Sequence, residues 1–370
     1  MVYPPVFCKG DYVLDTDLDL CHDLTHELEH NLRDSTGAGY AAFERTAGTE
    51  NCASFAQKKA TMKLIDVTKR FATDAQCLDY IEAMRWPNGV CCIHCGVLNV
   101  SKITREKKGR NQRTRIYQCL EKECGKQFSA TSGTIFNDSH LPLTKWFLAI
   151  ALICEAKKGM SACQLQRHLG VNYRTAWYLA HRIREAMQEG TLLGGVVEAD
   201  ETFLRPRKPR KGKPKVKNPN RMAVLGMIER GGKLKLVPVA DDKMASVEPP
   251  MREHIGPDAL LQTDSSFTHG WIGRYHFAGR HRMINHIVSY AEGENHTNGV
   301  ENAFSLLKRG IYGTYHQVSI KHLGRYCNEF SYRFNRRGEQ LQMFGETMKH
   351  LTRGKALPYA KLTASPVSEP

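Results

Sequence analysis

Apolar residues recur at helical spacing in two stretches of the first half of the chain. Between residues 62 and 90 they fall on one face and lead into a proline–glycine turn, so we expect a single N-terminal amphipathic helix there. Within residues 141–190, an apolar helix precedes a second helix, a turn at Gly170 and an arginine-rich third helix. This order is typical of helix-turn-helix DNA-binding regions and also of plain helical bundles.

The pattern changes over residues 195–337, where short apolar runs typical of strands alternate with amphipathic stretches. The expected elements are a strand at 195–204, a hairpin at 222–240, a helix near 245–255, a strand ending at residue 264, a strand near Tyr275–Phe277 and a helix from Asn298. Three antiparallel strands, a helix, a strand and a final helix are the order of an RNase H-like domain with a mixed sheet. We interpret residues 338–370 as a tail.

Charge is distributed unevenly along the 370 residues. The chain has 53 Lys and Arg against 38 Asp and Glu, a net charge of +15. Residues 1–61 contain 5 basic and 10 acidic residues, so the remainder carries +20. We interpret residues 1–61 as an acidic, weakly patterned extension, for which disorder is one open interpretation. The basic remainder indicates a polyanionic partner, most simply nucleic acid.

Hydropathy and cysteine content indicate the compartment. No apolar run approaches the roughly 18 residues of a membrane-spanning helix, and the N-terminus lacks the pattern of a signal peptide. We therefore expect no membrane association and a location in the bacterial cytoplasm or nucleoid, or in the nucleus of a eukaryote. In these compartments the twelve cysteines are expected to be thiols or metal ligands rather than disulfides.

Two cysteine pairs have the spacing of a tetrahedral zinc site. Cys92 and Cys95 form the first pair, Cys119 and Cys124 form the second, and a glycine follows each pair. The spacing predicts a zinc ribbon over residues 91–136, the alternative being four unrelated core cysteines. Because four ligands close the coordination sphere, the predicted Zn²⁺ is structural.

Three acidic residues lie in three different local patterns. Asp200 is in the first expected strand, Asp264 ends a later strand, and Glu301 lies on an amphipathic helix. Two strand-borne aspartates and a helix-borne glutamate can converge on two Mg²⁺ ions, for which Mn²⁺ is a substitute. The sequence therefore predicts a catalytic metal site for phosphoryl transfer.

The assignment of these acids has alternatives. Asn298 and Glu301 also have the spacing of a helix capping box, in which Glu301 would have a structural role only. Glu198 and Glu201 flank Asp200, and either could replace it if the strand register differs from the one expected.

Basic residues beside these acids are candidates for DNA contact. Residues 205–221 form a loop with nine basic residues, four prolines and no acid. Such loops are often only solvated, but this one leaves the strand that carries Asp200, which favours phosphate contact. The candidate DNA-binding residues are Lys308, Arg309, Arg174, Arg182, Arg207, Lys208, Arg210 and Lys211.

From about Met62 to Arg337, the sequence resembles bacterial insertion-sequence transposases of the DDE class, in the zinc-ribbon, ISXO-like branch related to the Merlin elements. Besides the ribbon, the resemblance is carried by Ala199–Phe203, Gln262–Ser265, Asn298–His316, Lys321–Leu323, Glu329–Arg337, and Leu169-Gly with Thr175-Ala-Trp177. Residues 1–61 have no counterpart, and Asn302 stands where glycine is common. The resemblance implies an RNase H-like core, Mg²⁺ dependence, and excision and insertion of DNA bounded by terminal inverted repeats.

The most consistent function is a DNA transposase. It would bind terminal inverted repeats and target DNA as a homo-oligomer, and catalyse Mg²⁺-dependent strand cleavage and strand transfer. A catalytically inactive DNA-binding regulator and a generic RNase H-like nuclease are the alternatives. The presence of all three predicted acids favours the transposase.

Overall fold

The computed structural model describes residues 62–104, 115–204, 222–284 and 296–364. It divides into two compact units, one containing residues 88–129 and the other containing residues 60–87 and everything from Ala130 onward. The acidic extension 1–61 and the basic loop 205–221 lie outside the described residues.

The smaller unit is a three-stranded antiparallel sheet. Its strands follow the order β1 (Val100–Thr104), β2 (Arg115–Cys119) and β3 (Gln127–Phe128). Tyr117 pairs with Phe128 across β2 and β3, and their rings stack with centroids 5.7 Å apart. With so little apolar area to bury, a unit of this size depends on a further stabilising element.

The second unit begins with two helices, where a single helix was expected. They are α1 (Leu64–Arg70) and α2 (Asp74–Arg85). Phe71 leaves helical geometry with ψ at 49°, and Thr73 starts α2 by accepting a hydrogen bond from the Gln76 amide. The expectation was wrong because apolar spacing continues through residue 73, whereas a threonine N-cap favours a new helix start.

Three further helices follow, and the last two of them form a helix-turn-helix pair. The elements are α3 (Leu143–Glu155), α4 (Ala162–Leu169) and α5 (Tyr173–Ala186). Gly170 ends α4 in the left-handed region, at φ 59°, and the Asn172 side chain then caps α5. The sequence predicted this glycine turn.

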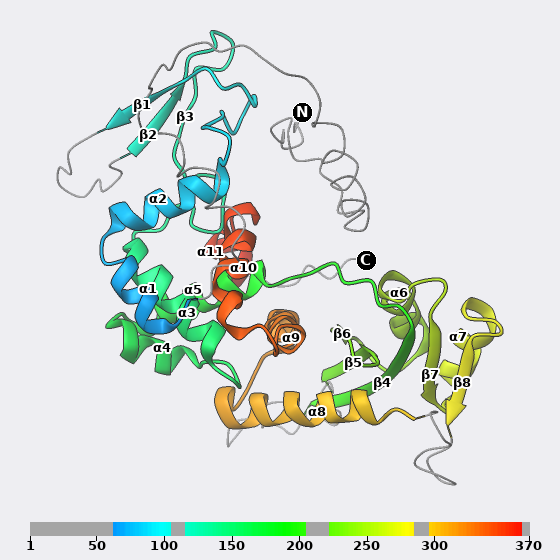
Figure 1. The fold of residues 1–370 in the computed structure, drawn as a ribbon. Coiled ribbons are helices and arrows are strands. Elements are labelled where there is room, and N and C mark those ends of the chain that lie inside the picture. The colour runs from blue at the N-terminus through cyan, green and yellow to red at the C-terminus, as the bar shows by residue number, and fades with distance from the viewer. Residues whose placement is uncertain (1–61, 105–114, 205–221, 285–295, 365–370) are drawn as a thin grey trace, which may run out of the picture. The chain divides into compact units, whose positions relative to one another are not determined.

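The rest of the second unit is built on a five-stranded mixed sheet (Figure 1). The strands are β4 (Val196–Leu204), β5 (Met222–Glu229), β6 (Leu234–Val239), β7 (Leu260–Asp264) and β8 (His281–Ile284), in the order β6-β5-β4-β7-β8. The β4–β5 and β5–β6 pairs are antiparallel, whereas β4–β7 and β7–β8 are parallel. This is the predicted mixed, RNase H-like sheet.

The strand expected near Tyr275–Phe277 is a helix. Ser266 caps α7 (Phe267–His276) by accepting a hydrogen bond from the amide of His269, and the strand comes later, as β8. The expectation was wrong because the short aromatic run fits both periodicities, and the cap decides between them.

The two faces of the sheet carry different helices. Alternate strand residues such as Val224 and Leu236 pack with α8 (Asn298–Gly310). The intervening residues, such as Ala199 and Met227, pack with α6 (Met244–His254) and α7. Side chains on β4 therefore belong to the α8 face at even positions and to the α7 face at odd positions.

The segment expected as a tail is largely helical. After the π-helix η1 (Ile311–Tyr315) and α9 (Ile320–Asn335), the chain forms α10 (Gln340–Arg353) and α11 (Tyr359–Thr363). One face of α10 is buried, including Phe344, Met348 and Leu351. The expectation of a tail was wrong because these residues have amphipathic spacing and pack with α2, α3 and α5.

Candidate metal centres and nucleic-acid interface

The four predicted cysteines form one compact cluster in the smaller unit. Their sulfur atoms all lie within 4.8 Å of one another. The Cys92–Cys124 and Cys95–Cys119 Sγ–Sγ distances are 3.7 and 3.6 Å. Zinc–sulfur bonds of about 2.3 Å in a tetrahedron place sulfurs about 3.8 Å apart, so the cluster fits Zn²⁺.

Backbone geometry supports this cluster. Gly96 and Gly125 have φ of 79° and 53°, which lets the chain turn back behind each cysteine pair. The His94 amide lies 3.4 Å from Cys92 Sγ. A backbone hydrogen bond at Lys126 lowers the pKa of the Cys124 thiol, whereas burial raises the pKa of the Cys119 thiol to about 12. The ribbon therefore supports a structural Zn²⁺ site.

Asp200 and Asp264 lie at the same level on neighbouring parallel strands. The last pair between β4 and β7 is Ala199 with Thr263, and each aspartate is the next residue. Burial raises the pKa of Asp200 to about 6, and the negative charges of Asp264 and Glu201 add to this rise. Two repelling carboxylates at the end of a strand pair are a suitable site for a divalent cation.

A histidine that the sequence interpretation missed holds Asp264. His269, on the first turn of α7, is fully buried. Its Nδ1 lies 2.5 Å from Asp264 Oδ1, and its Nε2 lies 2.9 Å from Glu201 Oε1. Although burial opposes the charged form, the two acids raise the pKa of His269 to about 10. These bonds also lower the pKa of Asp264, against the effect of its own burial. The Ser266 cap, three residues before His269, was the available signal.

The neighbours of Asp200 have other partners. Asp200 pairs with Gly226, which faces α8, so Asp200 is on the α8 face. Glu201 points to the opposite face and contacts His269. Glu198 shares the α8 face, but both of its oxygens accept hydrogen bonds. Of the three acids on β4, Asp200 is therefore the one that lies beside Asp264 on the neighbouring strand.

Glu301 is exposed on the first turn of α8 and accepts a hydrogen bond from Thr297 Oγ1 at 3.3 Å. The alternative capping box with Asn298 is not formed, because the helix has already begun at Asn298 and its N-cap is Thr297. Glu301 thus extends from a helix that packs on the face shared by Asp200 and Asp264.

The three carboxylates are less compact than the cysteines. Among the residues that the structure describes, the cysteine cluster is the one group of three or more His, Cys, Asp or Glu ligand atoms within 4.8 Å of one another. A two-ion site separates its outer ligands, because the ions themselves are about 3.5–4 Å apart. The all-oxygen donor set is of the kind that Mg²⁺ prefers.

The candidate DNA-binding residues differ in exposure. Arg174 and Arg309 are exposed, and Lys308 is half-buried on the same helix as Glu301. Arg182, however, is buried and donates hydrogen bonds to the Ile135 and Asn137 carbonyl oxygens. Its assignment as a DNA contact is therefore corrected to a structural role: it lies on the inner face of α5. Arg207, Lys208, Arg210 and Lys211 lie outside the described residues.

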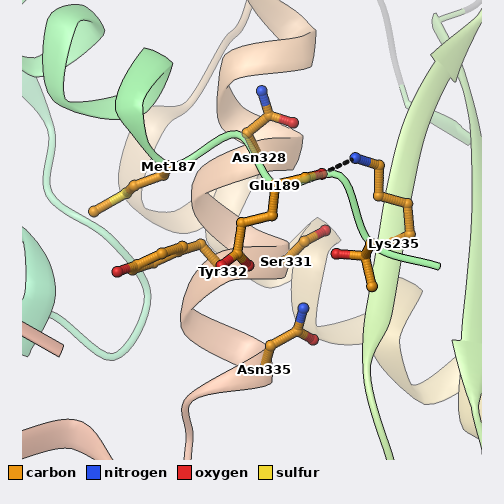
Figure 2. A pocket seen from close by; sticks show the side chains of 8 residues that line it. Met187, Glu189, Lys235, Asn328, Ser331, Tyr332 and Asn335 are labelled. Carbon is orange, nitrogen blue, oxygen red and sulfur yellow. Dashed lines mark hydrogen bonds between the residues drawn. The ribbon is translucent and has the colours of Figure 1, made fainter. Parts of the chain in front are cut away.

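A small polar pocket lies between β6, α9 and the segment after α5 (Figure 2). Lys235 Nζ donates to the Glu189 carbonyl oxygen at 2.7 Å across it, and Ser331 and Asn335 also line it. None of the predicted metal ligands lines this pocket, so we interpret it as part of the packing of α9 on the sheet.

No helix in the described ranges is long and apolar enough to cross a membrane.

Comparison with known proteins gives two matches in the same order as the structural units. Residues 72–127 match the transposase zinc-ribbon domain, and residues 192–335 match the ISXO2-like transposase domain. Together they cover more than half of the chain.

Two relatives have similar sequences. An uncharacterized protein in the transposable element ISH50 of Halobacterium salinarum is 29% identical over 138 residues, which are 37% of this chain and 44% of the relative. An uncharacterized transposase-like protein of Haemophilus influenzae is 28% identical over 122 residues, which are 33% of this chain and 95% of the relative. The chain thus spans less than half the length of the first relative and nearly all of the second. No solved structure matches the chain. Because the ribbon and the α/β domain match two transposase domains in the same order, the chain belongs to the ISXO2-like transposase family.

Proposed function

We propose that this transposase cleaves and joins DNA at a two-Mg²⁺ site formed by Asp200, Asp264 and Glu301. The observation that carries the proposal is the juxtaposition of Asp200 and Asp264 on two neighbouring parallel strands, just past the last residues that pair β4 with β7. The raised pKa of Asp200 supports it, since the charge of Asp264 contributes to the rise. Bound Mg²⁺ would neutralise charge on the phosphoryl group and activate the attacking oxygen.

The residues of the chain have separate roles in this proposal. Asp200 and Asp264 provide oxygen ligands from the rigid sheet, and Glu301 provides one from α8. His269 orients the Asp264 carboxylate through its bond to Oδ1. Lys308, two turns after Glu301 on the same helix, is placed to contact a DNA phosphate beside the acids.

DNA recognition would come from the other elements. The exposed first turn of α5, with Tyr173 and Arg174, is the part of the helix-turn-helix pair that is free to enter a groove, because most of the later helix is buried. We propose that this turn and the zinc ribbon bind the terminal inverted repeats. Two DNA ends must be held together for transposition, which favours a homo-oligomer on DNA.

The test is cleavage of DNA that carries the terminal repeats flanking the gene. The wild-type protein should nick this DNA at the repeat ends with Mg²⁺ or Mn²⁺, and should leave it intact with EDTA. Binding without cleavage would favour the inactive regulator. Cleavage of unrelated DNA at the same rate would favour a generic nuclease.

A further inference from the structure

The N-terminus of α8 is held by an acid from the sheet. The Gly299 and Val300 amides both donate to Glu198 Oε2, at 2.7 and 3.1 Å. The N-cap residue, Thr297, makes no side-chain cap bond. Glu198 therefore satisfies donors that a helix ordinarily leaves open, and its charge faces the positive end of the helix dipole.

A single arginine connects Glu198 to the other two elements of the site. Arg230 donates through Nη2 to Glu198 Oε1 at 3.0 Å and to Gln262 Oε1 at 2.7 Å. The same nitrogen lies 3.4 Å from the His296 carbonyl oxygen, in the segment that leads into α8. Arg230 thus links β4, β7 and the start of α8.

Glu198 and Gln262 are paired across β4 and β7, just before the two proposed aspartate ligands on these strands. Glu198 is two residues before Asp200 on β4, and Gln262 is two residues before Asp264 on β7, so each pair shares a face. The amides bound by Glu198 are one and two residues before Glu301. Every element that carries a predicted ligand is therefore fixed beside that ligand.

Two glycines allow the close approach. A Cβ atom at Gly299 would lie 2.7 Å from Glu198 Oε2. A Cβ atom at Gly226, the partner of Asp200, would lie 2.5 Å from the Phe304 ring of α8. A side chain at Gly299 would displace the Glu198 carboxylate from the α8 amides, and one at Gly226 would press on the Phe304 ring of α8.

We propose that Glu198 and Arg230 are positioning residues that set the distance of Glu301 from the two aspartates. Glu198 is not itself a metal ligand, because both of its oxygens are occupied and it is 2% exposed. This inference rests on the proposed function, since it assigns Glu301 to the metal site.

The first test uses Gly299→Ala. Because the added Cβ would displace the Glu198 carboxylate, a merely structural role predicts a lower melting temperature with unchanged metal binding. We instead expect loss of the Glu198 contact with the α8 amides and a rise of tenfold or more in the Mn²⁺ concentration for half-saturation, the range typical of lost supporting contacts at metal sites. Electron paramagnetic resonance of free Mn²⁺, with zinc-loaded protein and no DNA, measures this directly.

The matched control is Gly345→Ala on α10, where an added Cβ has no atom within 4 Å. It should leave Mn²⁺ binding at the wild-type value. The second variant is Glu198→Gln, whose single acceptor oxygen cannot serve both the helix amides and Arg230. Its control is Glu329→Gln, which breaks the buried ion pair with Arg184 elsewhere in the same unit. Glu329→Gln should lower the melting temperature without a tenfold change in Mn²⁺ binding.

The outcomes separate this inference from the proposed function. Weakened Mn²⁺ binding in both Gly299→Ala and Glu198→Gln, with both controls unchanged, supports the positioning role. If the wild-type protein binds Mn²⁺ and cleaves repeat DNA, but both variants bind Mn²⁺ within twofold of wild type, the positioning role is wrong and the proposed function stands. If the wild-type protein neither binds Mn²⁺ nor cleaves, the proposed function fails first.

Discussion

The cysteine cluster and the carboxylate site gather their ligands in opposite ways. The cysteines come from two short turns, and their sulfurs already lie within 4.8 Å of one another. The carboxylates come from β4, β7 and α8, where Asp200 and Asp264 repel each other and Glu301 is exposed. A closed four-ligand set suits a structural ion, whereas a spread and repelling set suits ions that exchange ligands with a substrate. In the proposed function, the ribbon is thus a site for stability, and the end of the β4–β7 pairing is a site for chemistry.

Removing the ribbon ligands should have the largest effect. The paired change Cys92→Ser and Cys119→Ser leaves two thiolates, and structural zinc contributes roughly 10–16 kcal/mol of apparent binding free energy in small domains. We expect loss of zinc and unfolding of β1–β3, visible by elemental analysis and by hydrogen exchange of the Tyr117 amide. One zinc per chain in the double variant would contradict the assignment of the ligands.

Neutralising a carboxylate should instead remove catalysis and spare the fold. Asp200→Asn, Asp264→Asn and Glu301→Gln each keep side-chain volume but remove a charge that would hold Mg²⁺. Several kcal/mol of transition-state stabilisation correspond to about a thousandfold in rate, so each should cut repeat-end cleavage at least that much. Repeat binding, measured by gel shift, should stay near the wild-type value. Substantial cleavage by any one variant would exclude that residue.

The raised pKa of Asp200 allows the difference between the two sites to be tested by protein stability. Burial and neighbouring acids raise its pKa from 3.8 to about 6, so without metal the ionised form is disfavoured in the folded state. Asp200 should therefore contribute a loss of stability as pH rises from about 4 to 6, and no further loss above that. Asp200→Asn should remove this loss and stabilise metal-free protein at pH 7 by on the order of 3 kcal/mol. Urea unfolding of zinc-loaded protein without Mg²⁺, Mn²⁺ or chelator at pH 4, 5 and 7 checks the slope, and added Mn²⁺ should stabilise only the wild-type protein.

The sequence predicted the features that depend on local spacing. The cysteine pairs, the hairpin and the amphipathic stripe of α8 are each encoded within a few residues, and they were confirmed. The break between α1 and α2 and the helices of the expected tail were missed, because apolar spacing alone does not show where a cap or a distant partner ends or buries a helix.

The side chains that support the carboxylate site could not be predicted from local sequence pattern either. His269 and Arg230 act on groups that the sheet order brings near. The Ser266 cap marks the start of the helix that carries His269, but local sequence does not specify either contact. Arg182 shows the reverse error. It belongs to a basic helix, yet its position on the inner face of α5 buries it. Whether a charged residue contacts DNA or packs inside is decided by helix orientation, which a basic pattern does not specify.

The smallest predicted effect concerns a single phosphate contact beside the acids. Lys308→Ala should weaken binding to repeat ends and reduce the slope of log affinity against log salt by about one, because one phosphate contact is lost. Arg182→Ala is the matched control, since its buried guanidinium donates to backbone carbonyl oxygens and its loss should lower the melting temperature while leaving the salt slope unchanged. Fluorescence anisotropy from 50 to 300 mM salt measures both slopes. A reduced slope for Arg182→Ala and an unchanged one for Lys308→Ala would place the DNA on α5 rather than along α8, and would separate the DNA path from the face that carries Glu301.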